Sequence, residues 1–171
     1  ADQVNMLNSA INNAPDGIGL AACDQDACLD ALQVAMDKGI PVVCFDSGIP
    51  KAPAGSVLST IATDNYGAGA TAADNLYAAL KEKIAGATAP VRVGEVNQEA
   101  TSESITSRGL GFIDKFSELA TADGKKVAVV GNEYYVNNCK DAGDEASADI
   151  IIEVAVPAQT TVELCATEAS V

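Results

Sequence analysis

The chain has 171 residues, of which 48% are hydrophobic and 20% are charged, a composition typical of a globular protein. Ten Lys and Arg face 24 Asp and Glu, and a formal charge of −14 would repel a nucleic-acid backbone, so no nucleic-acid partner is expected. No stretch approaches the roughly 18 to 20 consecutive apolar residues that a membrane-spanning helix needs.

Strand and helix patterns alternate along the first half of the chain. Apolar residues that recur every three or four positions predict helices, and short continuous apolar runs predict strands buried on both faces. The expected elements are a helix over 4–11, a strand over 17–22, a helix capped by Asp24 and closed by Gly39, a strand over 40–45 and a strand over 57–62.

The same alternation continues in the second half. The expected elements are a helix capped by Asp64 or Asn65 that ends before Gly86, strands over 91–96, 126–130 and 149–156, and helices over 102–119 and from about 160. Alternating strands and helices predict βαβ units, and therefore an α/β fold with parallel sheets. Because the sequence begins and ends inside helices, without the strands that should flank them, we expect it to be part of a longer protein.

Polar or acidic residues follow four of the predicted strands. In parallel α/β sheets, ligands bind beyond the carboxyl ends of the strands. Carboxylates and amides suit sugar hydroxyls, which donate and accept hydrogen bonds at once. The four places are Cys23-Asp24-Gln25, Asp46-Ser47, Thr63-Asp64-Asn65 and Asn97-Gln98-Glu99.

The candidate residues at these places each have a structural alternative. Asp46 is either an acceptor for a pair of hydroxyls or a turn-former before Gly48. Phe45 offers an apolar face to a sugar ring, or packs as a buried strand residue. Arg108 either directs its donors into a cleft or is a surface charge paired with Glu103.

Three further pairs of residues stand out. Asp64 and Asn65 are helix caps first and hinge candidates second. Tyr134 and Tyr135 suit either a carbohydrate platform or packing. Among the five cysteines, buried free thiols are expected, and Cys139 with Cys165 is the pair that we would choose for a bridge.

The sequence argues against an enzyme. It contains no histidine, so neither a Ser-His-Asp nor a Cys-His pair can be assembled, and a zinc site is not expected. It also contains no GxSxG elbow, phosphate-binding P-loop or GxGxxG dinucleotide loop. We therefore expect no catalytic residues, no metal and no cofactor.

Five motifs in family order resemble the type I periplasmic sugar-binding proteins, of which the ribose-binding protein is a familiar member. The resemblance covers residues 3 to 116, and the rest agrees only in the order of strands and helices. The motifs are Pro15-Asp16-Gly17-Ile18, Gly39-Ile40-Pro41-Val42-Val43, Phe45-Asp46-Ser47-Gly48, Thr63-Asp64-Asn65 and Ser107-Arg108-Gly109-Leu110-Gly111-Phe112.

This resemblance implies two Rossmann-like lobes, each a three-layer stack of helices around a parallel sheet, with a sugar bound between them. By the family pattern, residues 1–62 are part of lobe one, 63–65 are the hinge crossover and 66–171 are part of lobe two. Asp46 and Ser47 would bind the sugar from lobe one. Arg108, in the family's Arg-x-x-Gly-Phe motif, would reach it from lobe two. Asp24, Phe45 and Ser102 are further candidates.

The implied function is capture of a monosaccharide outside the cytoplasm, in the periplasm or at a lipid anchor, and delivery to the permease of an ABC transporter. Two rivals share the fold: the effector domain of a lactose-repressor-like regulator, and a chemotaxis or sensor ligand module. The chain lacks the family's first strand, helix and second strand, and the later half of lobe two. Other fragments of the same protein, or a second copy, would have to complete the sheets.

Overall fold

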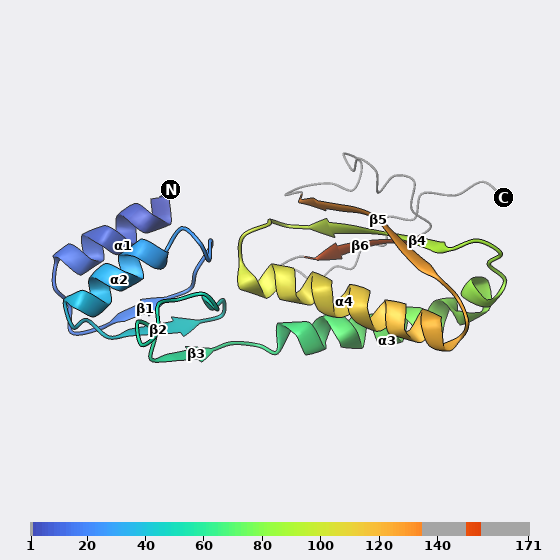
Figure 1. Cartoon of the computed structure of the whole chain (residues 1–171), viewed down its shortest axis with the longest axis horizontal. Coiled ribbons are helices and arrows are strands. Elements are labelled where there is room, and N and C mark those ends of the chain that lie inside the picture. The colour runs from blue at the N-terminus through green and yellow to red at the C-terminus, as the bar shows by residue number, and fades with distance from the viewer. Residues whose placement is uncertain (1, 135–149, 155–171) are drawn as a thin grey trace. The chain divides into compact units, whose positions relative to one another are not determined.

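The structure is a computed structural model that describes residues 2–134 and 150–154, with side chains as far as Ala128. The chain divides into two compact units, one formed by Ala1–Thr63 and Thr101–Ser104, the other by Asp64–Ala100 and Ile105–Val171. In the described residues each unit contains a three-stranded parallel sheet (Figure 1). The predicted α/β fold with parallel sheets is therefore confirmed.

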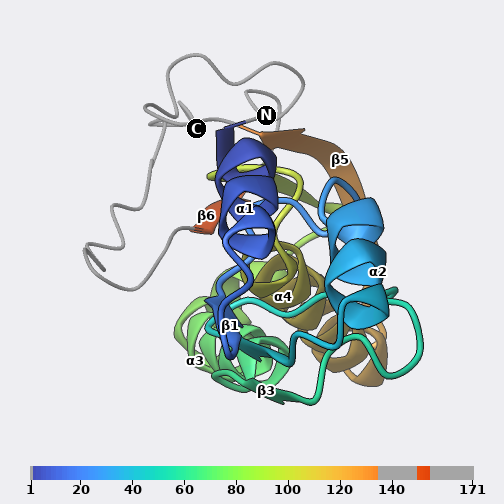
Figure 2. The same cartoon turned by 90° about the vertical axis from the view of Figure 1, so that its left-hand side faces the viewer.

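The first unit packs two helices against one face of its sheet (Figure 2). The strand order is β1-β2-β3, and Leu20, Cys44 and Thr60 lie side by side across the three strands. Its elements are α1 (Asp2–Asn12), β1 (Ile18–Leu20), α2 (Leu29–Asp37), β2 (Val42–Phe45) and β3 (Ser59–Ile61).

The core of the first unit lies between these helices and the sheet. Alternate residues of a strand point to one face, and residues three or four apart share one side of a helix, so β2 and α2 each present an apolar side here. The buried residues are Leu7, Ile11, Leu20, Ala22, Cys28, Ala31, Leu32, Ala35, Ile40, Val42, Cys44 and Ile49.

The opposite face of this sheet is exposed in the described part of the chain. Phe45 is 50% exposed and Ile61 is 64% exposed, and all of β3 is classed as exposed. The prediction of strands buried on both faces is therefore wrong for β2, and also for β1, where Gly19 is exposed. The reason is that α1 and α2 lie on one face only (Figure 1).

The second unit has the strand order β5-β4-β6, again with parallel pairing. The register between β4 and β5 shifts after Val93, where β5 contains one extra residue. Its elements are α3 (Asn65–Ala85), β4 (Val91–Asn97), α4 (Glu103–Ala122), β5 (Val127–Tyr134) and β6 (Ile150–Val154).

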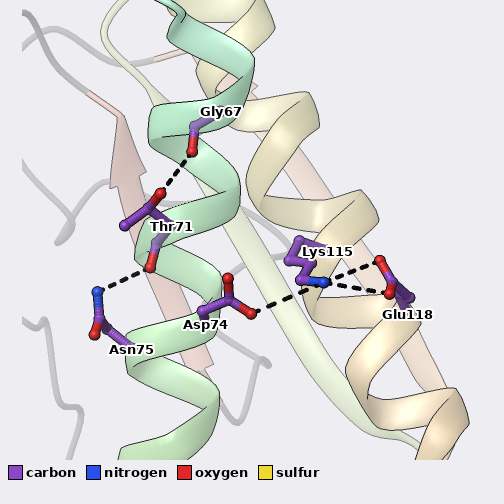
Figure 3. Close-up of polar contacts among 6 residues, drawn as sticks. All are labelled: Gly67, Thr71, Asp74, Asn75, Lys115 and Glu118. Atoms are coloured by element: carbon purple, nitrogen blue, oxygen red, sulfur yellow. Dashed lines mark hydrogen bonds and ion pairs between the residues drawn. The ribbon is translucent and has the colours of Figure 1, made fainter.

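Helices α3 and α4 lie alongside each other and share an aromatic core with β4. The Tyr77 and Phe116 rings meet edge to face at 5.3 Å, and Phe112 stacks on Phe116 at 5.6 Å. On the surface, the Lys115 ammonium of α4 lies 3.9 Å from the Asp74 carboxylate of α3 and 3.2 Å from Glu118 (Figure 3). These exposed ion pairs contribute little, so the aromatic contacts do most to hold the two helices together.

The predicted caps have different outcomes. Asp64 is the N-cap of α3, since its carboxylate accepts a hydrogen bond from the Gly67 amide at 2.9 Å, and Gly86 is the C-cap. Asp24 does not cap α2, which begins only at Leu29 after Cys28. Its Oδ1 instead accepts hydrogen bonds from Asp26 and Ala27, which form a turn before the helix.

Some predictions lie outside the described residues, namely the helix from about 160, Tyr135 and the Cys139–Cys165 bridge. None of the helices in the described ranges is both long and apolar enough to cross a membrane.

Leu32→Ala is expected to lower the free energy of unfolding of the first unit by about 2–5 kcal/mol, because it leaves a cavity in a fully buried part of the core. Val34→Ala, on the same helix at 42% exposure, should change it by less than about 0.5 kcal/mol. Urea denaturation followed by circular dichroism measures both, and equal effects would contradict the assigned core.

Candidate functional site

In the first unit, the loops after β1 and β2 leave the same edge of the sheet, because parallel strands have their carboxyl ends together. The loop after β1 contains Asp24, and the loop after β2 contains Asp46 and Ser47. The structure therefore brings three of the predicted site residues to one edge.

Asp46 has a backbone conformation that is unusual for any residue but glycine. Its φ is 61°, in the left-handed region, and the Ser47 amide donates a hydrogen bond to the Phe45 carbonyl across it at 2.7 Å. The Asp46 amide donates to the Ile61 carbonyl at 2.9 Å, which fixes the turn against β3. Such strain costs about 1–3 kcal/mol and is concentrated at functional sites. The Asp46 side chain is exposed beyond the sheet.

Ser47 is buried and binds the segment Thr101–Ser104, which belongs to the same unit. Its hydroxyl oxygen accepts a hydrogen bond from the Glu103 amide at 3.1 Å. The Thr101 hydroxyl donates to the Cys23 carbonyl at 2.8 Å, and the Gln25 amide donates to the Thr101 carbonyl at 3.1 Å. Both loops of the first unit are thus tied to this segment.

The remaining candidates of the first unit lie around this edge. Ser102 is buried, with its hydroxyl 3.4 Å from that of Ser104. The Asp24 carboxylate fixes the turn that follows it, as described above. The Phe45 ring is exposed on the uncovered face of the sheet, beside Gly19. Ligand contact by Asp46, Ser47, Asp24, Ser102 and Phe45 stays a prediction.

In the second unit, one side of β4 packs against α4. This side is apolar at the start of the strand and polar at the strand's carboxyl end. Val91 and Val93 belong to the core, and the next residues on that side are Glu95 and Asn97, both buried. The Asn97 amide nitrogen donates a hydrogen bond to Glu95 Oε1 at 2.8 Å. Burial raises the pKa of the Glu95 carboxyl, and this hydrogen bond opposes the rise in part.

Arg108 lies on α4 above this polar end and is partly buried. The adjacent Gly109 touches the Glu95 carboxylate so closely that a Cβ there would overlap Oε1. Sequence reasoning named Arg108 as a candidate and missed Glu95, and ligand contact by Arg108 stays a prediction. The available signal was a carboxylate at an alternating position of the strand in line with the apolar Val91 and Val93.

The proposed hinge residues begin the second unit. Asp64 caps α3, while Asn65 is buried, and its Oδ1 has no hydrogen-bond partner within the described residues. Their action as a hinge stays a prediction.

The described cysteines and acids show no metal centre. Cys28 and Cys44 are buried free thiols, whose pKa values burial raises, and Cys23 is exposed. In residues 2–134 and 150–154, no group of three or more Cys, Asp or Glu is arranged to hold a metal ion. Inert, packed thiols fit this pattern.

A family model described as "Periplasmic binding protein domain" matches residues 1–156. The chain belongs to this family. No match was found among the curated proteins. Membership agrees with the α/β units of parallel strands and with the position of Asp46 and Ser47 at a carboxyl edge.

Several solved structures of this fold are similar to the chain. A Brachyspira murdochii protein, described as an ABC transporter and LacI family transcriptional regulator, is 34% identical, with a TM-score of 0.63, over 85% of this chain and 46% of its own. An ABC transporter solute-binding protein from Agrobacterium vitis, with bound D-fucose, is 32% identical, with a TM-score of 0.62, over 78% of this chain and 42% of its own.

A sugar-binding protein of an ABC transporter from Bacillus halodurans is 29% identical, with a TM-score of 0.54, over 78% of this chain and 40% of its own. The chain thus spans less than half the length of each of these three proteins. The chain therefore corresponds to part of a periplasmic binding protein.

Replacing Asp46 tests the strained turn. Both Asp46→Ala and Asp46→Gly remove the carboxylate, but only glycine adopts a φ of 61° without steric cost. Asp46→Ala should therefore be about 1 kcal/mol less stable than Asp46→Gly in denaturant titration. Equal stability would show that the turn is not strained.

Glu95→Gln tests the buried carboxyl. Since the pKa of the Glu95 carboxyl is raised in the folded state, the stability that this carboxyl contributes is fully present below its unfolded-state pKa and is lost as pH rises through its folded-state pKa. The Gln variant does not titrate here and loses nothing. The Tm of the variant minus the Tm of the parent should therefore increase between pH 4 and pH 7.5, measured by thermal denaturation at both values. A constant difference would contradict a raised pKa.

Proposed function

We propose that this chain forms part of an extracytoplasmic solute-binding protein, which captures a monosaccharide or related small sugar between two lobes and delivers it to the permease of an ABC transporter. The main support is the turn at Asp46, where an exposed carboxylate is held in a strained conformation at the carboxyl edge of a parallel sheet. The sugar bound to the Agrobacterium vitis relative supports the ligand class.

Each proposed ligand residue has a chemical role. The Asp46 carboxylate accepts hydrogen bonds from a pair of sugar hydroxyls, and the Arg108 guanidinium donates to ring or hydroxyl oxygens. Ser47 accepts from the Glu103 amide and retains its own O–H for donation. Asp24 and Ser102 line the loops at the same edge, and Phe45 supplies apolar surface. No catalytic group is required, so the protein acts by binding rather than by turnover.

Closure of two lobes explains how binding is signalled. Residues 1–62 form part of one lobe, 66–171 form part of the other apart from Thr101–Ser104, which pack with the first unit, and 63–65 bend between the lobes. The sugar favours the closed form only if it binds that form more tightly than the open one. The permease then distinguishes the closed, loaded protein from the open one.

The regulator alternative is favoured by one observation, the description of the Brachyspira murdochii relative. A basic DNA-binding headpiece in the natural protein would support regulation, whereas a signal peptide or lipid-attachment cysteine would support transport. The net charge of −14 favours transport, because an acidic chain repels DNA.

Sugar affinity of the protein at its natural length tests the proposed function. Calorimetric titration against a monosaccharide panel that includes D-fucose should give one site per molecule. Asp46→Asn and Arg108→Lys should each weaken binding roughly 10- to 100-fold, because each removes a charged or bidentate hydrogen bond.

Two controls separate the site from general charge effects. Asp37→Asn at the end of α2 and Arg92→Lys near the start of β4 change exposed residues away from the carboxyl edges and should leave the affinity within about twofold. A natural-length protein that binds no sugar in the panel would refute the proposed function.

A further inference from the structure

The buried stripe of α4 contains a residue without a side chain. Residues at helical spacing along this stripe are Ile105, Gly109, Phe112, Phe116 and Ala120, and all five are buried. A glycine inside a helix costs stability relative to alanine, because it loses more conformational freedom on folding. Its presence between Ile105 and Phe112 therefore calls for a steric reason.

Glu95 supplies that reason. A Cβ on Gly109 would overlap Glu95 Oε1 and would lie 2.8 Å from the Glu95 carboxyl carbon and 3.1 Å from Asn97 Oδ1. The Asn97 hydrogen bond holds the carboxyl in place at 2.8 Å. The hole in the stripe is thus filled by a buried carboxyl from β4.

Two more glycines bring α3 and α4 together at their backbones. A Cβ on Gly69 of α3 would overlap the Arg108 carbonyl oxygen and lie 2.9 Å from the Phe112 nitrogen. A Cβ on Gly111 of α4 would overlap the Tyr66 carbonyl oxygen and lie 2.8 Å from its carbon. Backbone atoms cannot rotate aside as a side chain does, so either Cβ would push the helices apart.

We name Gly69, Gly109 and Gly111 the glycine cluster. Gly69 of α3 lies against the Arg108 carbonyl oxygen, while Gly109 and Gly111 follow Arg108 on α4 and lie against Glu95 and the Tyr66 backbone. Further along, large side chains hold the same helices together, with Tyr77 and Phe116 in contact at 5.3 Å. A Cβ in the glycine cluster would therefore tilt α4 at the Arg108 end while the aromatic end stays packed.

We propose that the three glycines of the cluster are positioning residues: the close contacts that they permit, with Glu95 and with the backbone of the facing helix, set the position and angle of the Arg108 backbone from which its side chain reaches the sugar. This inference rests on the proposed function of Arg108 in ligand binding. The long Arg side chain amplifies a small backbone displacement at its own Cα, so close packing at this point is more important than elsewhere on α4.

Gly69→Ala and Gly109→Ala, in the protein at its natural length, should weaken sugar binding roughly 10- to 100-fold, as an ångström-scale misplacement of a binding group does. Gly86→Ala at the end of α3 is the matched control. Its Cβ would lie 3.6 Å from the nearest atom, the Lys83 carbonyl oxygen, and affinity should stay within about twofold. Unchanged affinity in both test variants would overturn the proposal.

A second substitution tests the contact itself. Glu95→Ala removes the group that a Cβ on Gly109 would strike, so the Gly109→Ala/Glu95→Ala double variant should regain affinity relative to Gly109→Ala. The same change should not rescue Gly69→Ala, which collides with backbone. If Gly109→Ala does not fold, recovery of folding and binding in the double variant supports the contact, and a double variant that is equally damaged overturns it.

Amide hydrogen exchange of residues 105–112 without ligand separates this inference from the proposed function. Faster exchange in Gly69→Ala and Gly109→Ala, but not in Gly86→Ala, is expected whether or not a sugar binds. If the parent protein binds no sugar, the proposed function fails. The exchange data then decide by themselves whether the glycine cluster fixes the backbone of residues 105–112. If the parent binds sugar and the variants match it in exchange and affinity, the inference fails while the proposed function stands.

Discussion

Every strand pairing in the described residues is parallel, and parallel neighbours need a crossover connection that returns the chain to the same end of the sheet. In the first unit α2 crosses between β1 and β2, and in the second α4 crosses between β4 and β5. Because all strands of a sheet then end at one edge, loops far apart in sequence gather there. The polar groups at these edges are a consequence of this topology, and binding is the chemistry that it permits.

At both edges the structure maintains features that packing alone would not favour. Asp46 occupies a left-handed conformation, and Glu95 is a carboxyl buried beneath a helix. Each costs free energy that the apolar cores offset, from Leu32 and its neighbours in one unit and from Phe116 and its neighbours in the other. Local strain and buried polar groups are expected where a protein maintains a binding site.

The two ends of the α3–α4 pair differ in kind. Near the start of α3 the contact is backbone to backbone over Gly69, whereas from the middle of the helix it depends on Tyr77 and other large side chains. Large side chains tolerate adjustment through their rotamers, but a backbone contact has no such freedom. Arg108 lies at the end of the pair where the contacts are backbone to backbone.

The sequence by itself determined the kinds and order of the elements, since periodicity, the Asp64 cap and the terminal Gly86 are local signals. It also indicated the polar strand ends, including Asp46 and Ser47. Only the tertiary structure decided which sheet face is covered, that Asp24 forms a turn instead of a cap, and that Ser47 binds an amide 56 residues away. It also decided that Glu95 lies against Gly109. The physical reason is that each of these four features depends on which distant segments pack together, and local sequence propensity does not determine such long-range contacts.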